Sequence, residues 1–376
     1  MRTILHIGQP KTGSTALQAC LKASKAELAA AGVLYPDNPP GCRFNNHRLL
    51  IAGYTSFARL PRHIRRVPDY TAANMPAAYA AFRDHLAAEV AAAAPEVVIL
   101  SSESLFRTPS RRARAVLPAA LPPGSTAVDV AAYVRRPSEQ YLSNLQQRLR
   151  NSWRIGPLWV PPMAGILAGY ADLFGRDAVR PRLFAREALK DGDIVADFLA
   201  AWLPEAGLEA GALARGVNDN PSVSAESMDL LRRYRLAFHA KADNVIAPDS
   251  VQLVRALRRL EPEVGAGRPR LHVAVAEQLD FLRPDPLVLR DGWGIAFPGF
   301  DYAGLARRSR WRMPGLARLD RREPELGDIV VIDRDRQRAL VAALQESRWA
   351  RKAPARTAWV ADLAGNLPRA APAQTP

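Results

Sequence analysis

The chain has 376 residues, of which 48% are hydrophobic and 24% charged, and its formal net charge is +15 at pH 7. This length allows one large domain with an extension or two smaller domains, with a sizeable core. No apolar run reaches the length of a membrane span, no signal peptide is recognisable, and Cys20 and Cys42 are too few for a disulfide framework. We therefore expect a cytoplasmic protein without stable membrane insertion.

Strands and helices are expected to alternate along the first half of the chain. Short apolar strands are expected at 3–8, around 32–36, and at 96–103, 125–136 and 179–184, and helices at 14–31, 75–94, 109–121 and from Pro137. The segment 36–74 lacks sustained periodicity. Alternation of this kind predicts a P-loop-like three-layer α/β domain with a mostly parallel sheet.

The domain organisation follows from where this alternation stops. We expect a core over residues 1–215 and a helical part packed on it over 216–290. From about Arg283 the chain reads as irregular, which predicts an irregular extension over 291–376 that ends in a disordered tail, NLPRAAPAQTP.

The first strand is followed by the stretch GQPKTGST, which begins at Gly8 and ends at Thr15. It nearly matches the G-x-x-x-x-G-K-[ST] loop of nucleoside triphosphatases, but Ser14 stands where that loop requires lysine. Its lysine is Lys11, inside the loop. A Gly-rich loop between a strand and a helix binds phosphate through backbone N–H groups and the positive helix end.

A triphosphatase also needs groups that hold Mg²⁺. Here the two neighbouring strands end in Ser101 and Arg135, and Glu103 is the only acidic residue close to those ends. The sequence therefore predicts a phosphate-binding loop with few groups nearby that could hold a metal.

With lysine inside the loop, P-K-T-G-S-T resembles the 5′-phosphosulfate loop of sulfotransferases that use 3′-phosphoadenosine 5′-phosphosulfate (PAPS). A second motif supports the resemblance, because Arg135 and Ser143 have the strand-end arginine and the helical serine eight residues later that form this family's 3′-phosphate motif. The resemblance extends over roughly residues 3–203 and is strongest to bacterial members.

The resemblance implies a site and a reaction. Lys11 would neutralise the leaving oxygen, the loop residues Thr12, Gly13, Ser14 and Thr15 would hold the 5′-phosphate, and Arg135 with Ser143 would hold the 3′-phosphate. PAPS would be the co-substrate, adenosine 3′,5′-bisphosphate the product, and an acceptor hydroxyl would attack in line without a metal.

Two residues are candidates for the base that takes the acceptor proton. His47 lies in the irregular segment that is expected to shape the acceptor side, and Glu103 lies at a strand end where cytosolic members of the family carry a histidine. The sequence favours His47 without deciding between them. The family's adenine-stacking aromatic residue is replaced by Ala16, and the family's Arg-Lys-Gly loop is not found. The stretch from Asn220 to Ser224 is better explained as an N-cap for a helix from Ala225.

The acceptor implied by bacterial relatives is a carbohydrate. Two basic runs, Arg59–Arg66 and Ala306–Arg322, favour an anionic glycan, and the aromatic stretch Asp291–Tyr302 either stacks on sugars or packs against the core. No nucleic-acid module is recognisable, so no nucleic-acid partner is expected. Two alternatives stay open: a P-loop kinase or NTPase with an aberrant loop, and a non-catalytic protein that binds polyanions.

Overall fold

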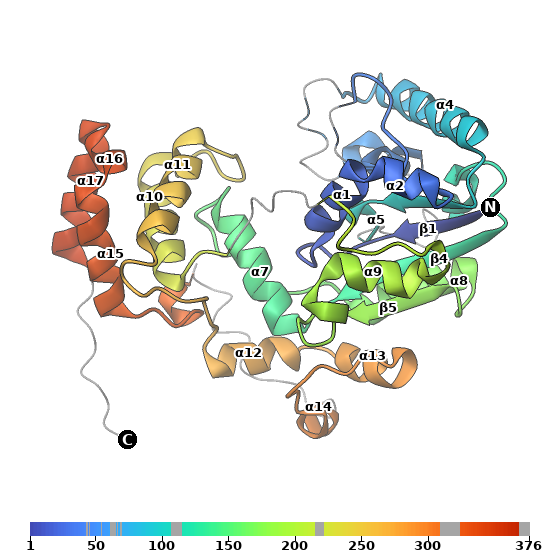
Figure 1. Cartoon of the computed structure of the whole chain (residues 1–376). Coiled ribbons are helices and arrows are strands. Elements are labelled where there is room, and N and C mark those ends of the chain that lie inside the picture. Colours follow the sequence, from blue (N-terminus) through green and yellow to red (C-terminus); the bar gives the residue numbers. More distant parts are fainter. Residues whose placement is uncertain are drawn as a thin grey trace. The chain divides into compact units, whose positions relative to one another are not determined.

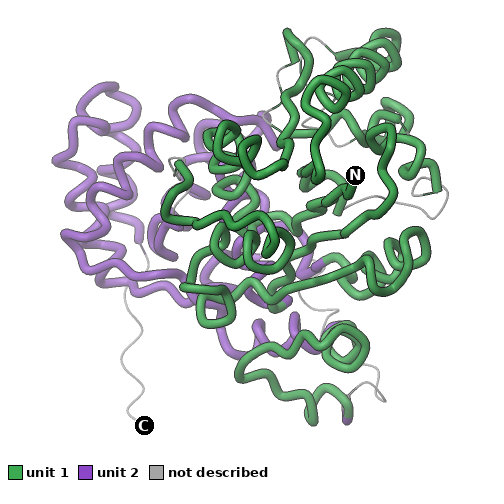
Figure 2. The backbone as a smooth tube through the Cα atoms, turned by 45° about the vertical axis from the view of Figure 1, so that its right-hand side comes forward, with its two compact units in different colours: residues 1–136, 161–219, 283–306 green, residues 137–160, 220–282, 307–376 purple. Residues whose placement is uncertain are grey.

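The structure is a computed structural model, and it describes residues 1–42, 44, 46–53, 55–60, 65, 67, 70–106, 115–214, 222–308 and 324–367. The chain divides into two compact units (Figure 2): unit 1 comprises residues 1–136, 161–219 and 283–306, and unit 2 comprises 137–160, 220–282 and 307–376. These limits differ from the boundaries near 215 and 290 expected from the sequence. Each unit is described by itself.

Unit 1 is built on a parallel five-stranded sheet, as the sequence predicts. The strands are β1 (Arg2–His6), β2 (Val33–Leu34), β3 (Val97–Ser101), β4 (Ala127–Val134) and β5 (Val179–Leu183). Their order is β2-β3-β1-β4-β5, and β1 pairs in parallel with both β3 and β4. The chain therefore builds the sheet first to one side of β1 and then to the other, and ligands in such sheets bind outside the carboxyl ends of the strands at this point.

Helices cover both faces of the sheet (Figure 1). The helices of unit 1 are α1 (Ser14–Ala23), α2 (Lys25–Ala30), α4 (Met75–Ala93), α5 (Glu103–Phe106), α8 (Met163–Phe174), α9 (Ile194–Trp202), α13 (Asp285–Trp293) and α14 (Tyr302–Arg308). One face packs against α1, α2 and α9 through Ile4, Ile99 and Tyr133. Residues of the opposite parity, such as Leu5 and Leu100, are fully buried too. The mixed α/β fold class is therefore confirmed.

One helix predicted in unit 1 needs correction, and another helix was missed. The helix expected over 14–31 is interrupted at Ser24, whose Oγ accepts a hydrogen bond from the Ala214 N–H. Helix α8 was not predicted, although it contacts β4 and β5. The expected irregular segment 36–74 contains short 3-10 turns at Arg48–Gly53 and Phe57–Arg59.

Unit 2 is helical. Its helices are α7 (Pro137–Leu149), α10 (Ala225–His239), α11 (Pro248–Leu260), α12 (Val273–Asp280), α15 (Arg334–Glu346), α16 (Arg348–Arg351) and α17 (Pro354–Asn366). Ser224 caps α10 by accepting the Ser227 N–H, as the sequence predicts. The irregular extension expected after residue 290 is corrected, because α15 and α17 pack into the core of this unit through residues such as Leu340 and Val360. The expected tail lies mostly in 368–376, outside the described residues.

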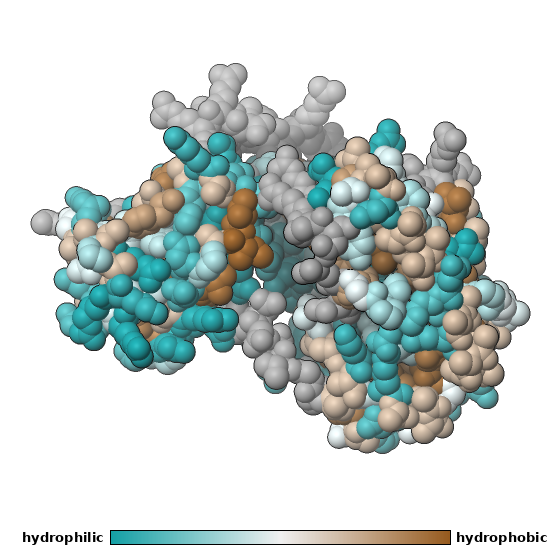
Figure 3. Space-filling view, turned by 90° about the horizontal axis from the view of Figure 1, so that it is seen from above, coloured by the Kyte–Doolittle hydropathy of each residue, from teal (hydrophilic) through white to brown (hydrophobic). Residues whose placement is uncertain are grey.

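No helix in the described part of the chain is long and apolar enough to cross a membrane. The face drawn in Figure 3 mixes hydrophilic (teal) and weakly hydrophobic (tan) residues, and the strongly hydrophobic (brown) residues stand in a few small groups.

Candidate functional site

The loop that joins β1 to α1 has the geometry of an anion-binding site. Gly13 is the N-cap of α1 with φ 76°, and Thr12 closes the preceding turn, since its N–H and its Oγ1 both donate to the carbonyl oxygen of Gln9, at 3.3 Å and 2.6 Å. The first N–H groups of α1 have no partner within the helix, and they carry the positive end of its dipole. The loop therefore presents donors at the carboxyl end of the central strand.

Both glycines of the loop are required by close contacts. A Cβ added to Gly8 would lie 2.6 Å from Ser14 Oγ, and one added to Gly13 would lie 2.9 Å from the ring of Phe184. Real Cβ atoms do not approach other atoms so closely, so a larger residue would displace the Ser14 hydroxyl or the Phe184 ring. The two glycines are kept by packing and not only by backbone conformation.

Two buried polar atoms near Gly8 have no hydrogen-bond partner within the described residues. They are Ser14 Oγ and His6 Nε2, and their residues are at most 1% exposed. The Cβ position of Gly8 is 2.6 Å from the first and 3.1 Å from the second, so the two atoms flank the same point. Unsatisfied buried polar groups are rare and costly. A ligand oxygen that accepts from the Ser14 hydroxyl would relieve one of them.

Lys11 adopts a left-handed backbone conformation, with φ 71°. This conformation costs a non-glycine residue about 1–2 kcal/mol, so it persists only where the surroundings impose it. Thr15, one residue into α1, is exposed.

The structure brings Arg135 to this loop through two residues that the sequence analysis did not single out. The Arg135 N–H donates to Gln9 Oε1 at 2.9 Å, and Gln9 is fully buried. The Arg135 guanidinium lies 4.7 Å from the ring centroid of Phe184, the ring that also contacts Gly13. Gln9 lies within the quoted loop and carries no motif signal, and Phe184 could be found only from the folded structure.

Ser143, the partner expected for Arg135, lies on α7 in unit 2 and is half-buried. Its role in 3′-phosphate binding stays a prediction.

Ser101, the last residue of β3, connects the loop to His47. Its Oγ lies 2.8 Å from His6 Nδ1 and accepts from Gln18 Nε2 at 2.9 Å, while its N–H donates to His47 Nδ1 at 2.9 Å. Burial lowers the pKa of both His6 and His47 to about 4. These histidines are therefore neutral at pH 7.

His47 has both ring nitrogens occupied by the backbone. Its Nδ1 accepts from the Ser101 N–H, and its Nε2 lies 2.9 Å from the Pro36 carbonyl oxygen, which can only accept a proton from it. The lone pair needed to take an acceptor proton is therefore already in use. This arrangement favours a positioning role for His47.

Glu103 is the first residue of α5 and is half-buried. It follows Ser102, whose N–H donates to the His6 carbonyl oxygen at 3.0 Å, so Glu103 lies just beyond the joined ends of β1 and β3. Burial lowers the pKa of Arg48, and the negative charge of Glu103 opposes this shift. Arg48 therefore places a positive charge close to the carboxylate.

The remaining sequence predictions concern the aromatic stretch, the two basic runs and metal binding. Phe297 and Phe300 are buried, and Arg136 lies 5.3 Å from the ring centroid of Phe300, which favours packing for the aromatic stretch. Most of both basic runs lies outside the described residues, at 61–64, 66 and 309–323. Within the described ranges, no group of three or more His, Cys, Asp or Glu residues is placed to hold a metal ion.

Comparisons with known proteins add one structural match. A sulfotransferase from Alicyclobacillus acidocaldarius is matched over 71% of this chain and 97% of its own, with a TM-score of 0.33 and 15% identity. No protein-family model and no curated protein matches the chain. At this TM-score the match carries no argument about function, which rests on the residues described above.

Proposed function

We propose that this protein transfers a sulfuryl group from PAPS to a hydroxyl group of a carbohydrate. The observation that carries the proposal is the β1–α1 loop. Its lysine is Lys11, and the buried Ser14 hydroxyl at the start of α1 has no hydrogen-bond partner among the described residues. Arg135 is tied to the same loop by Gln9 and Phe184. A basic residue at this place suits a nucleotide with a second phosphate group.

The residues present fit the 5′-phosphate end of PAPS, which supplies the sulfuryl group. The Ser14 hydroxyl and the first N–H groups of α1 would bind the phosphate oxygens. Lys11 would stabilise the negative charge that develops on the leaving oxygen. Arg135 would bind the 3′-phosphate, with Ser143 as its expected partner.

A bond forms between the acceptor oxygen and sulfur, and the bond between sulfur and the bridging phosphate oxygen breaks with its electron pair. The acceptor proton passes to a carboxylate. Glu103 is the candidate for this carboxylate, because hydrogen bonds already occupy both ring nitrogens of His47. The products are a sulfate ester and adenosine 3′,5′-bisphosphate. Transfer of radiolabelled sulfate from PAPS to glycans in the presence of EDTA tests the proposal directly, and transfer only to phenols would remove the carbohydrate acceptor.

Glu103→Gln is expected to lower turnover by about 100- to 10,000-fold, because general base catalysis contributes that much. His47→Gln should instead lower the free energy of unfolding by about 1–3 kcal/mol for each buried partner left unpaired, and keep most of the turnover per folded molecule. Steady-state kinetics and urea unfolding of both variants separate these outcomes. Full turnover in the Glu103 variant would eliminate Glu103 as the base.

A further inference from the structure

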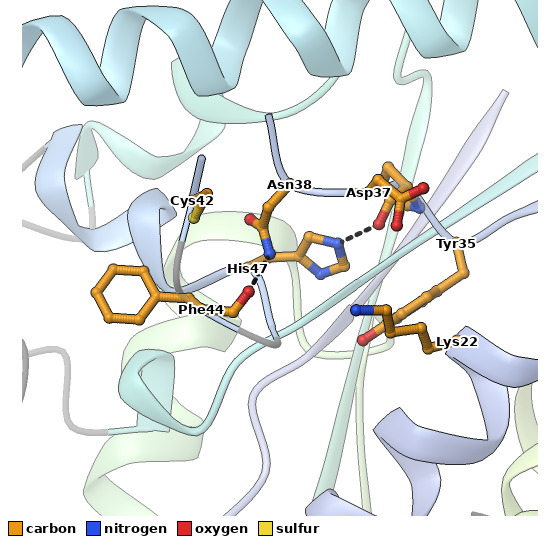
Figure 4. A pocket seen from close by; sticks show the side chains of 8 residues that line it. Lys22, Tyr35, Asp37, Asn38, Cys42, Phe44 and His47 are labelled. Carbon is orange, nitrogen blue, oxygen red and sulfur yellow. Dashed lines mark hydrogen bonds between the residues drawn. The ribbon is translucent and has the colours of Figure 1, made fainter. Parts of the chain in front are cut away.

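A small polar pocket lies at the carboxyl end of β2, in unit 1. It has a volume of about 120 Å³ and is lined by Lys22, Tyr35, Pro36, Asp37, Asn38, Cys42, Phe44 and His47 (Figure 4). The β1–α1 loop and the Glu103 region do not contribute to its lining. The pocket is too small for a whole nucleotide, and it suits one terminal group of a larger ligand.

The pocket carries hydrogen-bonding atoms that nothing satisfies within the described residues. The Tyr35 hydroxyl has no partner although Tyr35 is only 3% exposed, and Asn38 Oδ1 has none either. The Asn38 amide is held in one orientation, because its Nδ2 donates to the carbonyl oxygens of Phe44 at 2.9 Å and Asn46 at 3.2 Å. Asn38 therefore offers an acceptor. Burial, with the charge of Asp37, raises the pKa of Tyr35, so its hydroxyl stays a donor.

The charges of the lining favour an anion. Asp37 is paired with Lys25, at 2.6 Å between the carboxylate and the ammonium, and Lys25 does not line the pocket. Lys22, on the last turn of α1, lines the pocket and makes no ion pair within the described part of the chain. Figure 4 shows the tips of Lys22 and Tyr35 on the same side of the pocket.

We propose that this pocket binds a carboxylate with a neighbouring hydroxyl group, as a uronic acid carries. Lys22 and the Tyr35 hydroxyl bind the carboxylate, and Asn38 Oδ1 accepts from the hydroxyl. In the sheet, β2 is separated from β1 by β3 alone, so the pocket lies roughly 10 Å from the end of β1 at the usual strand spacing. An acidic oligosaccharide can bridge this distance, and the pocket's role as an acceptor subsite rests on the proposed transfer function.

The test is a titration of isotope-labelled protein with D-glucuronate, with no nucleotide present, followed by amide chemical shifts. Saturable shifts are expected at the amides of Tyr35, Asp37, Asn38, Asn46 and His47. Lys22→Met should weaken binding by about tenfold or more, since a charge-assisted hydrogen bond is lost, and Tyr35→Phe by a smaller factor. Lys241→Met removes an exposed lysine from unit 2 and should leave the affinity unchanged.

Each outcome bears on the proposal. D-glucose should bind at least tenfold more weakly than glucuronate, because it lacks the carboxylate. Lactate that binds as well as glucuronate would support the carboxylate and hydroxyl chemistry but assign it to a small hydroxy acid. Absence of saturable shifts would overturn the proposal. Wild-type affinity for glucuronate in both Lys22→Met and Tyr35→Phe would overturn it too. Because no nucleotide is present, the result is independent of whether sulfuryl transfer occurs.

Discussion

Replacing Lys11 by glycine is expected to lower sulfuryl transfer by about 100- to 1000-fold without destabilising the protein. The rate falls because one preorganised positive group at the leaving oxygen is lost. Stability is kept because glycine adopts φ 71° without strain, whereas lysine pays for it. We expect the free energy of unfolding to stay constant or rise by up to about 1 kcal/mol. The gain is limited because glycine also increases the entropy of the unfolded chain, which opposes the relief of strain.

The matched control is Ala94→Gly. Ala94 also has a positive φ, of 41°, and it lies on the surface at the end of α4, away from the loop in sequence. This variant relieves the same kind of strain, so its turnover should equal that of the wild type. Urea unfolding and turnover measured on the same samples test both variants. Unchanged turnover in Lys11→Gly would show that the lysine has no part in the transfer.

The free energy of unfolding is expected to fall as the pH is lowered from about 6.5 to 4. His6 and His47 are neutral in the folded protein because burial lowers their pKa from 6.5 to about 4. In this window the unfolded chain binds protons at both histidines and the folded protein does not, so acid favours unfolding. A shift of this size corresponds to about 3 kcal/mol for each histidine, fully lost once the pH falls below 4.

Variants separate this effect from the titration of carboxylates. His6→Gln and His47→Gln should each reduce the loss measured by urea unfolding between pH 7 and 4.5 by a similar amount, about 2–3 kcal/mol. A wild-type protein whose stability is flat over this range would contradict the buried, neutral state of both histidines.

The sheet of unit 1 could be predicted because β1, β3 and β4 are short, mostly apolar stretches that lead into polar residues. The break of the first helix at Ser24 could not be predicted, because no glycine or proline stands there. Helix α15 was missed for another reason. Its periodic Leu340, Val341 and Leu344 are visible in the sequence, but the Arg, Gly and Pro content of the preceding segment outweighed them.

The candidate site was predictable to a similar extent. Spacing marked Lys11, Ser14 and Arg135, and the structure places Ser14 at the start of α1 and the Arg135 N–H on Gln9 of the same loop. The link between the loop and Arg135 was not predictable, since Gln9 and Phe184 act through tertiary contacts. The hydrogen bonds of His47 also follow from the fold alone, because Pro36 and Ser101 meet it only when β2 and β3 are in place.

Calorimetric binding of adenosine 3′,5′-bisphosphate and of Mg-ATP tests the central claim most directly. We expect the bisphosphate to bind in EDTA, with Ser14→Ala and Arg135→Gln each weakening binding by about tenfold or more, as expected for hydrogen bonds to a charged ligand. Arg255→Gln, on the exposed side of α11, is the control and should bind as the wild type does. Binding of Mg-ATP with no binding of the bisphosphate would contradict the account and assign the loop to a triphosphate.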